Sequence, residues 1–379
     1  VSPGTPDLSG LLAHIAAMPE GSWSKVNLNN FSDVWTPAAL RPLYGTSSNP
    51  TPSKIIQAWS SFAWDPKRAT LLLYGGGHAN YSGNDVYLWR ASTLRLERAS
   101  LPSQVVQDSL GIRNAIDGAD KAPASAHTYD NNLFFPRIDR MLVLGGAADR
   151  NGGHFLTLDT ATTSRKTGPY LFDPARAHPD RVGGSTGSHV QRVAPYPEII
   201  GGHMWSNRES WLNASAGSTP PSESFVNSCA EYAEEDGRDV AYVRTAYRLY
   251  RYRIADLADA ASDRWELVGR YLNGSGTQAT CSYDTGRKVF VSTNRSTSSP
   301  FAYWDLNTPG TKNSEIYFTP VDPTGEFPQL LSSGAIDIRY CGIDFDTARS
   351  QHKLWCGDGR VWTISAPAAL GSTGWTIAK

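Results

Sequence analysis

The sequence predicts an all-β fold, a β-propeller with six or seven four-stranded antiparallel blades and a short N-terminal helix. Short apolar and aromatic runs alternate with Gly, Asn and Asp clusters along most of the 379 residues, which is the pattern of strands joined by tight turns. One such unit recurs along the chain, and a repeating unit is stronger evidence for an architecture than a local motif. Radial repetition of small sheets leaves few exposed strand edges, so the repeat favours a propeller over a sandwich of two sheets.

The first 54 residues differ from the rest of the chain. Leu8–Met18 has the composition of a short helix, and Ser22–Leu28 is predicted to be a strand. The terminal segments Trp23–Leu28 and Gly374–Ile377 are able to close the ring, by completing the last blade or by forming a seventh. The sequence therefore predicts a single propeller domain over residues 1–379, with the helix and a ring-closing strand in 1–54 and the blades in 55–379.

The repeat is aligned on an aromatic residue followed by Asp, and a short apolar strand comes after each copy. Its clear copies are Phe62–Asp65, His127–Asp130, Cys281–Asp284 and Ile343–Asp346. Two further units, at His189–Gly202 and Cys229–Val243, match less well. Each unit is interpreted as one antiparallel meander, which gives six visible blades.

Composition limits the classes of partner. The net charge of −1 creates no general attraction to nucleic acid or to an acidic membrane surface, so neither partner is expected. No run approaches the ~18 apolar residues of a membrane helix. The N-terminus shows no charged-then-apolar leader, which fits a mature chain whose signal peptide was removed or one that never had it.

The four cysteines, Cys229, Cys281, Cys341 and Cys356, lack the spacing of a zinc site. Buried free thiols are one interpretation. An even number of cysteines in a chain of this composition instead favours disulfides and a secreted or periplasmic protein, with Cys341 and Cys356 able to pair across one predicted hairpin. We separately expect a monomer.

Propeller geometry predicts which loops meet. The start of the innermost strand and the end of the next strand lie on the same face of the ring, so polar residues at these places are expected around the central channel. The set is rich in His, Arg and Tyr and poor in carboxylates, which suits an anionic ligand. Its members are His78, Asn80, Tyr81, His127, Arg150, His189, His203, Trp205, Asn207, Arg208, Arg244, Tyr247, Asn294, Arg295, Arg339 and Tyr340.

Several members also have a structural interpretation. His78 follows a glycine run and can fix a turn, and His127 can be a packed residue. Arg208 and Arg244 can form salt bridges between blades. The alternatives remain open from sequence alone.

The residue types favour one chemistry over others. A glycoside hydrolase normally needs two facing carboxylates, and the rim offers only Asp85, Asp149, Glu209 and Glu231, without a paired pattern. No GxSxG or HExxH motif is present. β-Elimination on a uronate instead needs a base near neutral pKa, an acid for the leaving oxygen, and a group that neutralises the carboxylate. His, Tyr, Arg and Asn are the types that fit these roles.

On these residues the chain looks like a kelch-type propeller, and its rim is similar to that of the seven-bladed propeller polysaccharide lyases, such as ulvan lyases and rhamnose–glucuronate lyases. The residues that carry the similarity are His189 and His203, in Ser188–Gln191 and Gly202–Arg208, together with Arg244 and Tyr247. The resemblance implies a secreted lyase that cleaves an acidic, uronic-acid-containing polysaccharide by β-elimination.

The resemblance also implies roles. His203 or His189 would be the base, Tyr247 the acid, and Arg244 with Asn80 or Arg208 the carboxylate clamp. The substrate-binding set would be His78, Asn80, Tyr81, His127, Trp205, Asn207, Arg208, Arg295 and Arg339, with Trp205 offering a flat surface to a sugar ring. No cofactor is expected, although the sequence leaves a structural calcium or zinc ion open. The alternatives are a glycoside hydrolase on the same fold and a non-catalytic propeller that binds a glycan or a protein.

Overall fold

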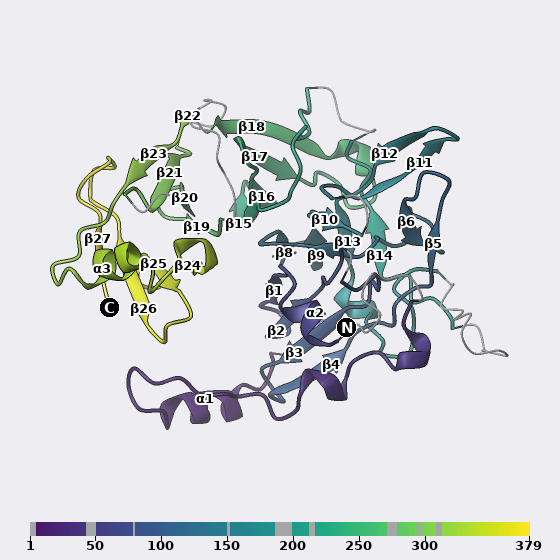
Figure 1. Ribbon diagram of the computed structural model, residues 1–379, viewed down its shortest axis with the longest axis horizontal. Helices are drawn as coiled ribbons and strands as arrows, with labels where there is room; N and C mark the ends of the chain where they lie inside the picture. The colour runs from purple at the N-terminus through teal and green to yellow at the C-terminus, as the bar shows by residue number, and fades with distance from the viewer. Residues whose placement is uncertain are drawn as a thin grey trace. The chain divides into compact units, whose positions relative to one another are not determined.

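The computed structural model describes residues 5–42, 51–78, 80–149, 152–185, 199–211, 217–270, 279–294, 298–307 and 313–379. Within these ranges the fold is an all-β propeller of antiparallel blades, as predicted, with few helices (Figure 1). The chain divides into two compact units, which we call unit 1 (Val1–Ser215 with Asp256–Asp263) and unit 2 (Ala216–Ala255 with Arg264–Lys379).

Unit 1 holds two four-stranded blades and three small strand pairs. The first blade has the order β1 (Phe62–Asp65), β2 (Thr70–Leu73), β3 (Tyr87–Arg90), β4 (Arg95–Arg98). The second has the order β14 (Trp205–Asn207), β13 (Tyr170–Phe172), β9 (Arg140–Val143), β8 (Asn132–Phe135). The small pairs are β5 (Val105–Gln107) with β6 (Arg113–Ala115), β7 (Ala126–His127) with β10 (Ala147–Ala148), and β11 (Leu156–Thr160) with β12 (Thr163–Lys166).

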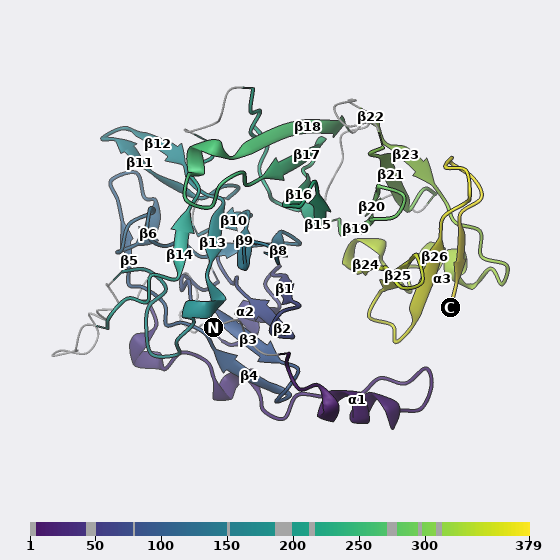
Figure 2. The same ribbon diagram turned by 180° about the vertical axis from the view of Figure 1, so that it is seen from behind.

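Unit 2 holds three blades, which Figure 2 shows from behind in green to yellow. The first is β15 (Cys229–Glu235), β16 (Arg238–Arg244), β17 (Arg248–Arg253) and β18 (Arg264–Arg270), extended by β22 (Asn313–Ser314). The second is β19 (Cys281–Asp284), β20 (Val289–Thr293), β21 (Phe301–Asp305) and β23 (Ile316–Phe318). The third is β24 (Gly342–Asp346), β25 (Gln351–Trp355), β26 (Val361–Ser365) and β27 (Thr376–Ala378).

The helices are short. The α-helices are α1 (Ser9–Ala16), α2 (Ser53–Ile56) and α3 (Glu326–Ser333), and single 3₁₀ turns occur at Phe31–Asp33, Ala38–Leu40, Pro174–Arg176, Ala260–Ser262 and Ile338–Tyr340. The helix α1 lies within the predicted Leu8–Met18. The helix α3 packs on the last blade, where the ring centroids of Phe327 and Trp362 lie 5.2 Å apart. Among the described residues, no helix has the length and apolar character needed to cross a membrane.

The aromatic-plus-Asp repeat has a physical cause. Asp65 Oδ1 accepts the backbone N–H of Arg68 at 3.1 Å, and its Oδ2 accepts from Arg68 Nη1 at 2.7 Å. The same two bonds join Asp284 to Arg287 and Asp346 to Arg349. An Asp side chain that bonds backbone two or three residues on fixes a tight turn. The Asp of the repeat therefore closes the turn between the first two strands of a blade.

This turn shows that the repeat copy predicted at His127–Asp130 is out of register. The first strand of the second blade is β8, which begins at Asn132. His127 instead ends β7, where it pairs with Ala147 of β10. The predicted strand assignment of His127 was therefore wrong.

The described residues form five blades rather than the predicted six or seven. The unit predicted at His189–Gly202 falls largely on residues 186–198, outside the described residues. The segment that follows it, Trp205–Asn207, is the outer strand β14 of the second blade. The predicted strand over Ser22–Leu28 is irregular, whereas the C-terminal segment completes the last blade as β27.

Both units have apolar cores between their sheets. In unit 2 the cores are reinforced by two disulfides, Cys229–Cys281 and Cys341–Cys356, so all four cysteines of the sequence are paired. The predicted pairing of Cys341 with Cys356 is confirmed. Disulfides of this kind persist in oxidising compartments, which is compatible with a secreted protein.

Candidate active site

The connection between β2 and β3 carries His78 and Asn80 to the end of β7. Gly77 makes this approach possible, because a Cβ atom on Gly77 would lie 2.4 Å from the backbone nitrogen of Ala126. Gly146 plays the same part for β10, since its φ is 150° and a Cβ there would lie 1.8 Å from the His127 carbonyl oxygen. The glycines therefore bring His78, Asn80 and His127 together in unit 1.

His78 and His127 form a pair of imidazoles with different surroundings. Their ring centroids lie 5.5 Å apart at an interplanar angle of 72°. His127 is 3% exposed, whereas His78 is exposed to solvent. Asn80 Nδ2 lies 2.8 Å from His127 Nε2. Because an amide nitrogen only donates, Nε2 accepts this hydrogen bond, and a neutral ring carries its proton on Nδ1.

Burial, and to a smaller extent the repulsion of a second positive charge by the neighbouring His78 imidazole, lowers the pKa of His127 to about 4. His127 is therefore neutral at pH 7. The neutral His127 imidazole is held by a hydrogen bond to Asn80. A fixed ring of this kind can orient the exposed His78 imidazole next to it.

Two aromatic residues that the sequence analysis did not select complete the cluster. The ring centroid of Trp59 lies 5.1 Å from that of His127, and the ring centroid of Tyr129 lies 6.4 Å from it. Trp59 is 52% exposed, and its carbonyl oxygen accepts the Tyr129 N–H at 2.6 Å. Burial raises the pKa of Tyr129, so its phenol keeps its proton at neutral pH. We call Trp59, His78, Asn80, His127 and Tyr129 the histidine cluster.

The backbone of the histidine cluster is strained at three positions. Trp59, His78 and Tyr129 have φ of 49°, 48° and 50°, in the left-handed region that residues other than glycine seldom occupy. Such residues cost about 1–3 kcal/mol each and concentrate at functional sites. Nine other described residues that are not glycine also have a positive φ, several of them in hairpin turns, so this conformation helps to place the three rings but does not by itself mark a site.

Of the two aromatic residues that were not predicted, only Tyr129 could have been found from the sequence. Tyr129 lies in the repeat copy that contains His127, so a correct strand register would have placed both near the same loop. Trp59 precedes the first strand and carries no pattern. Its place beside His127 depends on the hydrogen bond between the Trp59 and Tyr129 backbones.

Other predicted residues of unit 1 have structural roles. Trp205 is buried, and its ring centroid lies 5.2 Å from that of Tyr74 and 5.0 Å from that of Phe172. It belongs to the core and does not present a surface to a sugar. Tyr81 is also buried, and its hydroxyl donates to Asp85 at 3.2 Å.

Arg208 is fully engaged inside unit 1. Its Nε and Nη2 donate to the two carboxylate oxygens of Asp263 at 2.9 and 2.8 Å, and Nη1 donates to the Leu257 carbonyl oxygen at 2.7 Å. The structure thus gives Arg208 the salt-bridge role rather than a place in a carboxylate clamp. Asn207 next to it accepts the backbone N–H of Gly168 at 2.8 Å and holds a turn.

His203 is exposed, with φ of 51°, on the segment that leads into β14. Its backbone N–H donates to the Gly184 carbonyl oxygen at 2.9 Å. Among the described residues, no interaction joins its side chain to the histidine cluster. His189 and Arg295 lie outside the described residues.

The remaining predicted residues belong to unit 2. Arg244 is buried at the end of β16, and Tyr247 is 51% exposed in the turn between β16 and β17. Arg339 donates from Nε to both carboxylate oxygens of Asp337, at 2.8 and 3.0 Å. Arg339 is thereby held by a local ion pair.

Two of the four carboxylates that the sequence places at the rim have structural partners. Asp85 is buried and accepts hydrogen bonds from Thr36 and Tyr87, and burial raises its pKa. Glu209 pairs with Arg165 at 2.5 Å. These partners do not favour a mechanism based on two carboxylates.

Comparison with known proteins does not assign a family. No family model and no curated protein matches the chain. Among solved structures, the chain is similar to the major Malassezia sympodialis allergen Mala s 1, at 12% identity over 84% of this chain and 77% of that one, with a TM-score of 0.33. It is also similar to the GH74 xyloglucanase of Xanthomonas campestris, at 13% identity over 93% of this chain and 51% of that one, with a TM-score of 0.37. The chain thus spans about half of the xyloglucanase, and at these TM-scores neither protein indicates what this chain does.

Proposed function

We propose that the chain is a polysaccharide lyase that cleaves an acidic, uronic-acid-containing polysaccharide by β-elimination. The observation that carries this proposal is the pairing of exposed His78 with buried, neutral His127, beside a protonated Tyr129. The two disulfides support a secreted or periplasmic location.

The reaction requires two proton transfers around one uronate residue. A base removes the proton from C5, and the electron pair of that C–H bond forms the C4=C5 double bond. The bond from C4 to the glycosidic oxygen breaks, and an acid protonates the departing oxygen. Positioned acids and bases of this kind contribute about 10²–10⁴-fold each to the rate.

The histidine cluster supplies both groups. His78 is open to solvent, so its imidazole is the proposed base at C5. His127 is a positioning residue, because it is buried and its Nε2 is held by Asn80. Tyr129 keeps its proton at neutral pH and is the proposed acid for the departing oxygen.

Two further members would hold the substrate. The Asn80 amide has two N–H groups and uses one of them on His127, so the second is available to the uronate carboxylate. Trp59 offers an exposed indole to the apolar face of a sugar ring. His203 as an alternative base, Tyr247 as an alternative acid and Arg244 as a carboxylate clamp remain separate candidates. The same assay tests each of them.

The test is the ultraviolet absorbance of the unsaturated uronate product, measured on polygalacturonate, alginate, glucuronan and ulvan. Wild-type protein is expected to produce this absorbance on at least one polymer. His78→Ala is expected to lower kcat/KM by about 10²–10⁴-fold. His14→Ala is the control, because His14 lies on α1, outside the histidine cluster, and its Nε2 lies 2.9 Å from Ser24 Oγ.

Other outcomes would overturn the proposal. New reducing ends without the absorbance would show hydrolysis. Binding of a polymer without any product would indicate a non-catalytic propeller. Full activity of His78→Ala would remove the base from the histidine cluster.

A further inference from the structure

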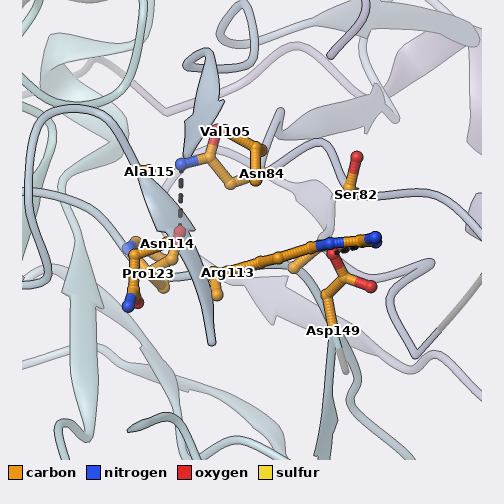
Figure 3. Close-up of a pocket in the computed structure, with 10 residues that line it drawn as sticks. Ser82, Asn84, Val105, Arg113, Asn114, Ala115, Pro123 and Asp149 are labelled. Atoms are coloured by element: carbon orange, nitrogen blue, oxygen red, sulfur yellow. Dashed lines mark hydrogen bonds and ion pairs between the residues drawn. The ribbon is translucent and has the colours of Figure 1, made fainter. Parts of the chain in front are cut away.

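The small pocket inside unit 1 near the histidine cluster is closed to ligands. It lies among Ser82, Ser125, Arg113 and Asp149, and Figure 3 shows the Arg113 side chain reaching the Asp149 carboxylate. Arg113 Nη1 lies 3.5 Å from Asp149 Oδ2, and the space that remains has no room for a water molecule. A substrate that extends beyond the cluster does not enter this pocket, so its further units have to lie on an exposed surface.

Large aromatic side chains are exposed along β1 and directly before it. Trp59, Phe62 and Trp64 are 52%, 42% and 46% exposed, although side chains of this kind are usually well buried. Successive residues of a strand point to opposite faces, so Phe62 and Trp64 share one face, and Ala63 between them is buried on the other. The Cα atoms of Phe62 and Trp64 are about 6.5 Å apart in such a strand. We call Trp59, Phe62 and Trp64 the aromatic row.

The aromatic row begins at the histidine cluster. Ser61, which precedes β1, donates its N–H to Thr128 Oγ1 at 3.2 Å. Thr128 lies between His127 and Tyr129 of the cluster, so this bond fixes the start of β1 beside it. The five residue steps of the aromatic row span at most about 18 Å, which is longer than one sugar ring. The row is therefore placed to hold more than one unit of a chain that starts at the cluster.

The area of the aromatic row favours a slender partner over a second copy of the chain. A fully buried Phe or Trp side chain contributes about 150–250 Å², so three half-exposed rings offer roughly 200–350 Å². A stable protein–protein interface takes about 800 Å² from each partner. An exposed apolar patch of a few hundred Å² is instead common on monomers, where it is often functional.

The turn after β1 adds a positive charge that suits an acidic sugar. The Lys67 side chain is 40% exposed, and its Nζ lies 3.9 Å from Asp139 Oδ1, which is beyond a hydrogen bond. Asp139 is held by Arg68 instead, through Nη1 at 2.8 Å and Nη2 at 2.7 Å. The Lys67 ammonium is therefore able to turn to a uronate carboxylate at the end of the aromatic row.

We propose that the aromatic row and Lys67 form a platform for the sugar units next to the one bound at the histidine cluster. The apolar faces of sugar rings lie on Phe62 and Trp64, and a uronate carboxylate pairs with Lys67. The inference rests on the proposed acidic glycan substrate. It adds that the protein takes a long chain in preference to a short oligosaccharide, because a short one fills the cluster and leaves the platform empty.

The test measures affinity against chain length. Titration calorimetry on the His78→Ala background, with oligosaccharides of increasing length from each of the four polymers, gives the Kd without turnover. In this parent the Kd is expected to fall as the chain becomes longer. Trp64→Ala is expected to raise the Kd of the longest oligosaccharides about tenfold and to leave that of the shortest unchanged. Lys67→Gln should raise the same Kd at low salt but not at high salt, since salt screens exposed charges.

Trp23→Ala is the control, because Trp23 is 65% exposed and lies outside the histidine cluster and the aromatic row. Each Kd of this variant is expected to equal that of the parent. The urea midpoint and the molar mass of Trp64→Ala are also expected to equal those of the parent. A lower midpoint would show that the rest of the chain packs on Trp64, and dissociation of a dimer would assign this face to a second copy. Either result would overturn the platform.

Three outcomes separate the platform from the proposed reaction. A higher Kd of long oligosaccharides in Trp64→Ala, together with absence of unsaturated product from wild-type protein, would retain the platform and reject the lyase. Unsaturated product with an unchanged Kd at every chain length would retain the lyase and reject the platform. Absence of both oligosaccharide binding and product, in wild-type protein as in the His78→Ala parent, would reject both.

Discussion

Replacement of Arg208 by alanine is expected to lower the stability of unit 1 rather than to weaken substrate binding. The Arg208 side chain is 3% exposed and the Asp263 side chain is fully buried, and the two are joined by two hydrogen bonds of 2.8–2.9 Å. Arg208 also donates to the carbonyl oxygens of Asp256 and Leu257. Truncation of Arg208 therefore leaves a buried carboxylate without its cation.

Removal of one partner from a buried ion pair costs about 3–5 kcal/mol. At 1.4 kcal/mol per tenfold, the unfolding equilibrium constant rises roughly 10² to 4 × 10³-fold. This is a large share of the 5–15 kcal/mol that typical domains possess. The measurement is urea denaturation followed by tryptophan fluorescence, with the loss seen as a lower midpoint.

A matched control variant and a double-mutant cycle show whether the loss of stability comes from this ion pair. Arg349→Ala breaks the 3.1 Å pair with Asp346, where the arginine side chain is 71% exposed, and is expected to cost at most about 1 kcal/mol. Asp263→Ala together with Arg208→Ala completes a double-mutant cycle, in which the two losses are not additive. The reasoning is refuted if Arg208→Ala unfolds at the wild-type urea concentration while the KM for the polymer rises, because Arg208 would then be the clamp.

Three further predictions concern pH, cross-links and the two tryptophans. Burial lowers the pKa of His352 to about 4, so between pH 6.5 and 4 the unfolded chain binds a proton that the folded chain does not. The free energy of unfolding is therefore expected to fall by up to about 3 kcal/mol across that window. His352→Asn, compared with wild type in urea titrations at each pH, should remove this part of the fall. Replacing Cys341 and Cys356 by serine opens a loop of 15 residues and is expected to lower the free energy of unfolding by about 3 kcal/mol. The melting temperature under non-reducing conditions should fall, and equal melting temperatures would contradict this. Trp205→Ala should lower the free energy of unfolding by about 3–5 kcal/mol through the loss of core packing, whereas Trp59→Ala should raise the KM with little loss of stability. The opposite pattern would reject Trp205 as a core residue and Trp59 as a substrate contact.

The strand content of the blades was largely predictable. In β16 and β20, apolar residues run almost without interruption between turn residues, and both strands lie where the sequence predicted them. Strand signals of this kind are local, so they do not depend on the rest of the fold. Blade number was not predictable in this way, because β14 joins β13 from far along the chain and the sequence pattern does not state which strands pair.

The residues of the histidine cluster illustrate the same division. The sequence singled out His78, Asn80 and His127 by residue type and by their places after or within predicted strands. The structure brings these three together, although through β7 rather than through an innermost blade strand. Trp59 and Tyr129 were missed because a backbone hydrogen bond and left-handed φ values, rather than any periodic pattern, place their rings beside His127.

The sequence by itself determined the all-β class and the aromatic-plus-Asp repeat, and it suggested the pairing of Cys341 with Cys356. All of these depend on residue type and short spacing, which act through local hydrogen bonds and alternation. Only the tertiary structure decided that Arg208 and Trp205 are buried supports, that Ser82, Ser125 and Asp149 meet at one pocket, and that His127 is neutral. Burial and the meeting of distant segments decide these properties, because desolvation and the choice of hydrogen-bond partner depend on what lies nearby in space and not on what is adjacent in the chain.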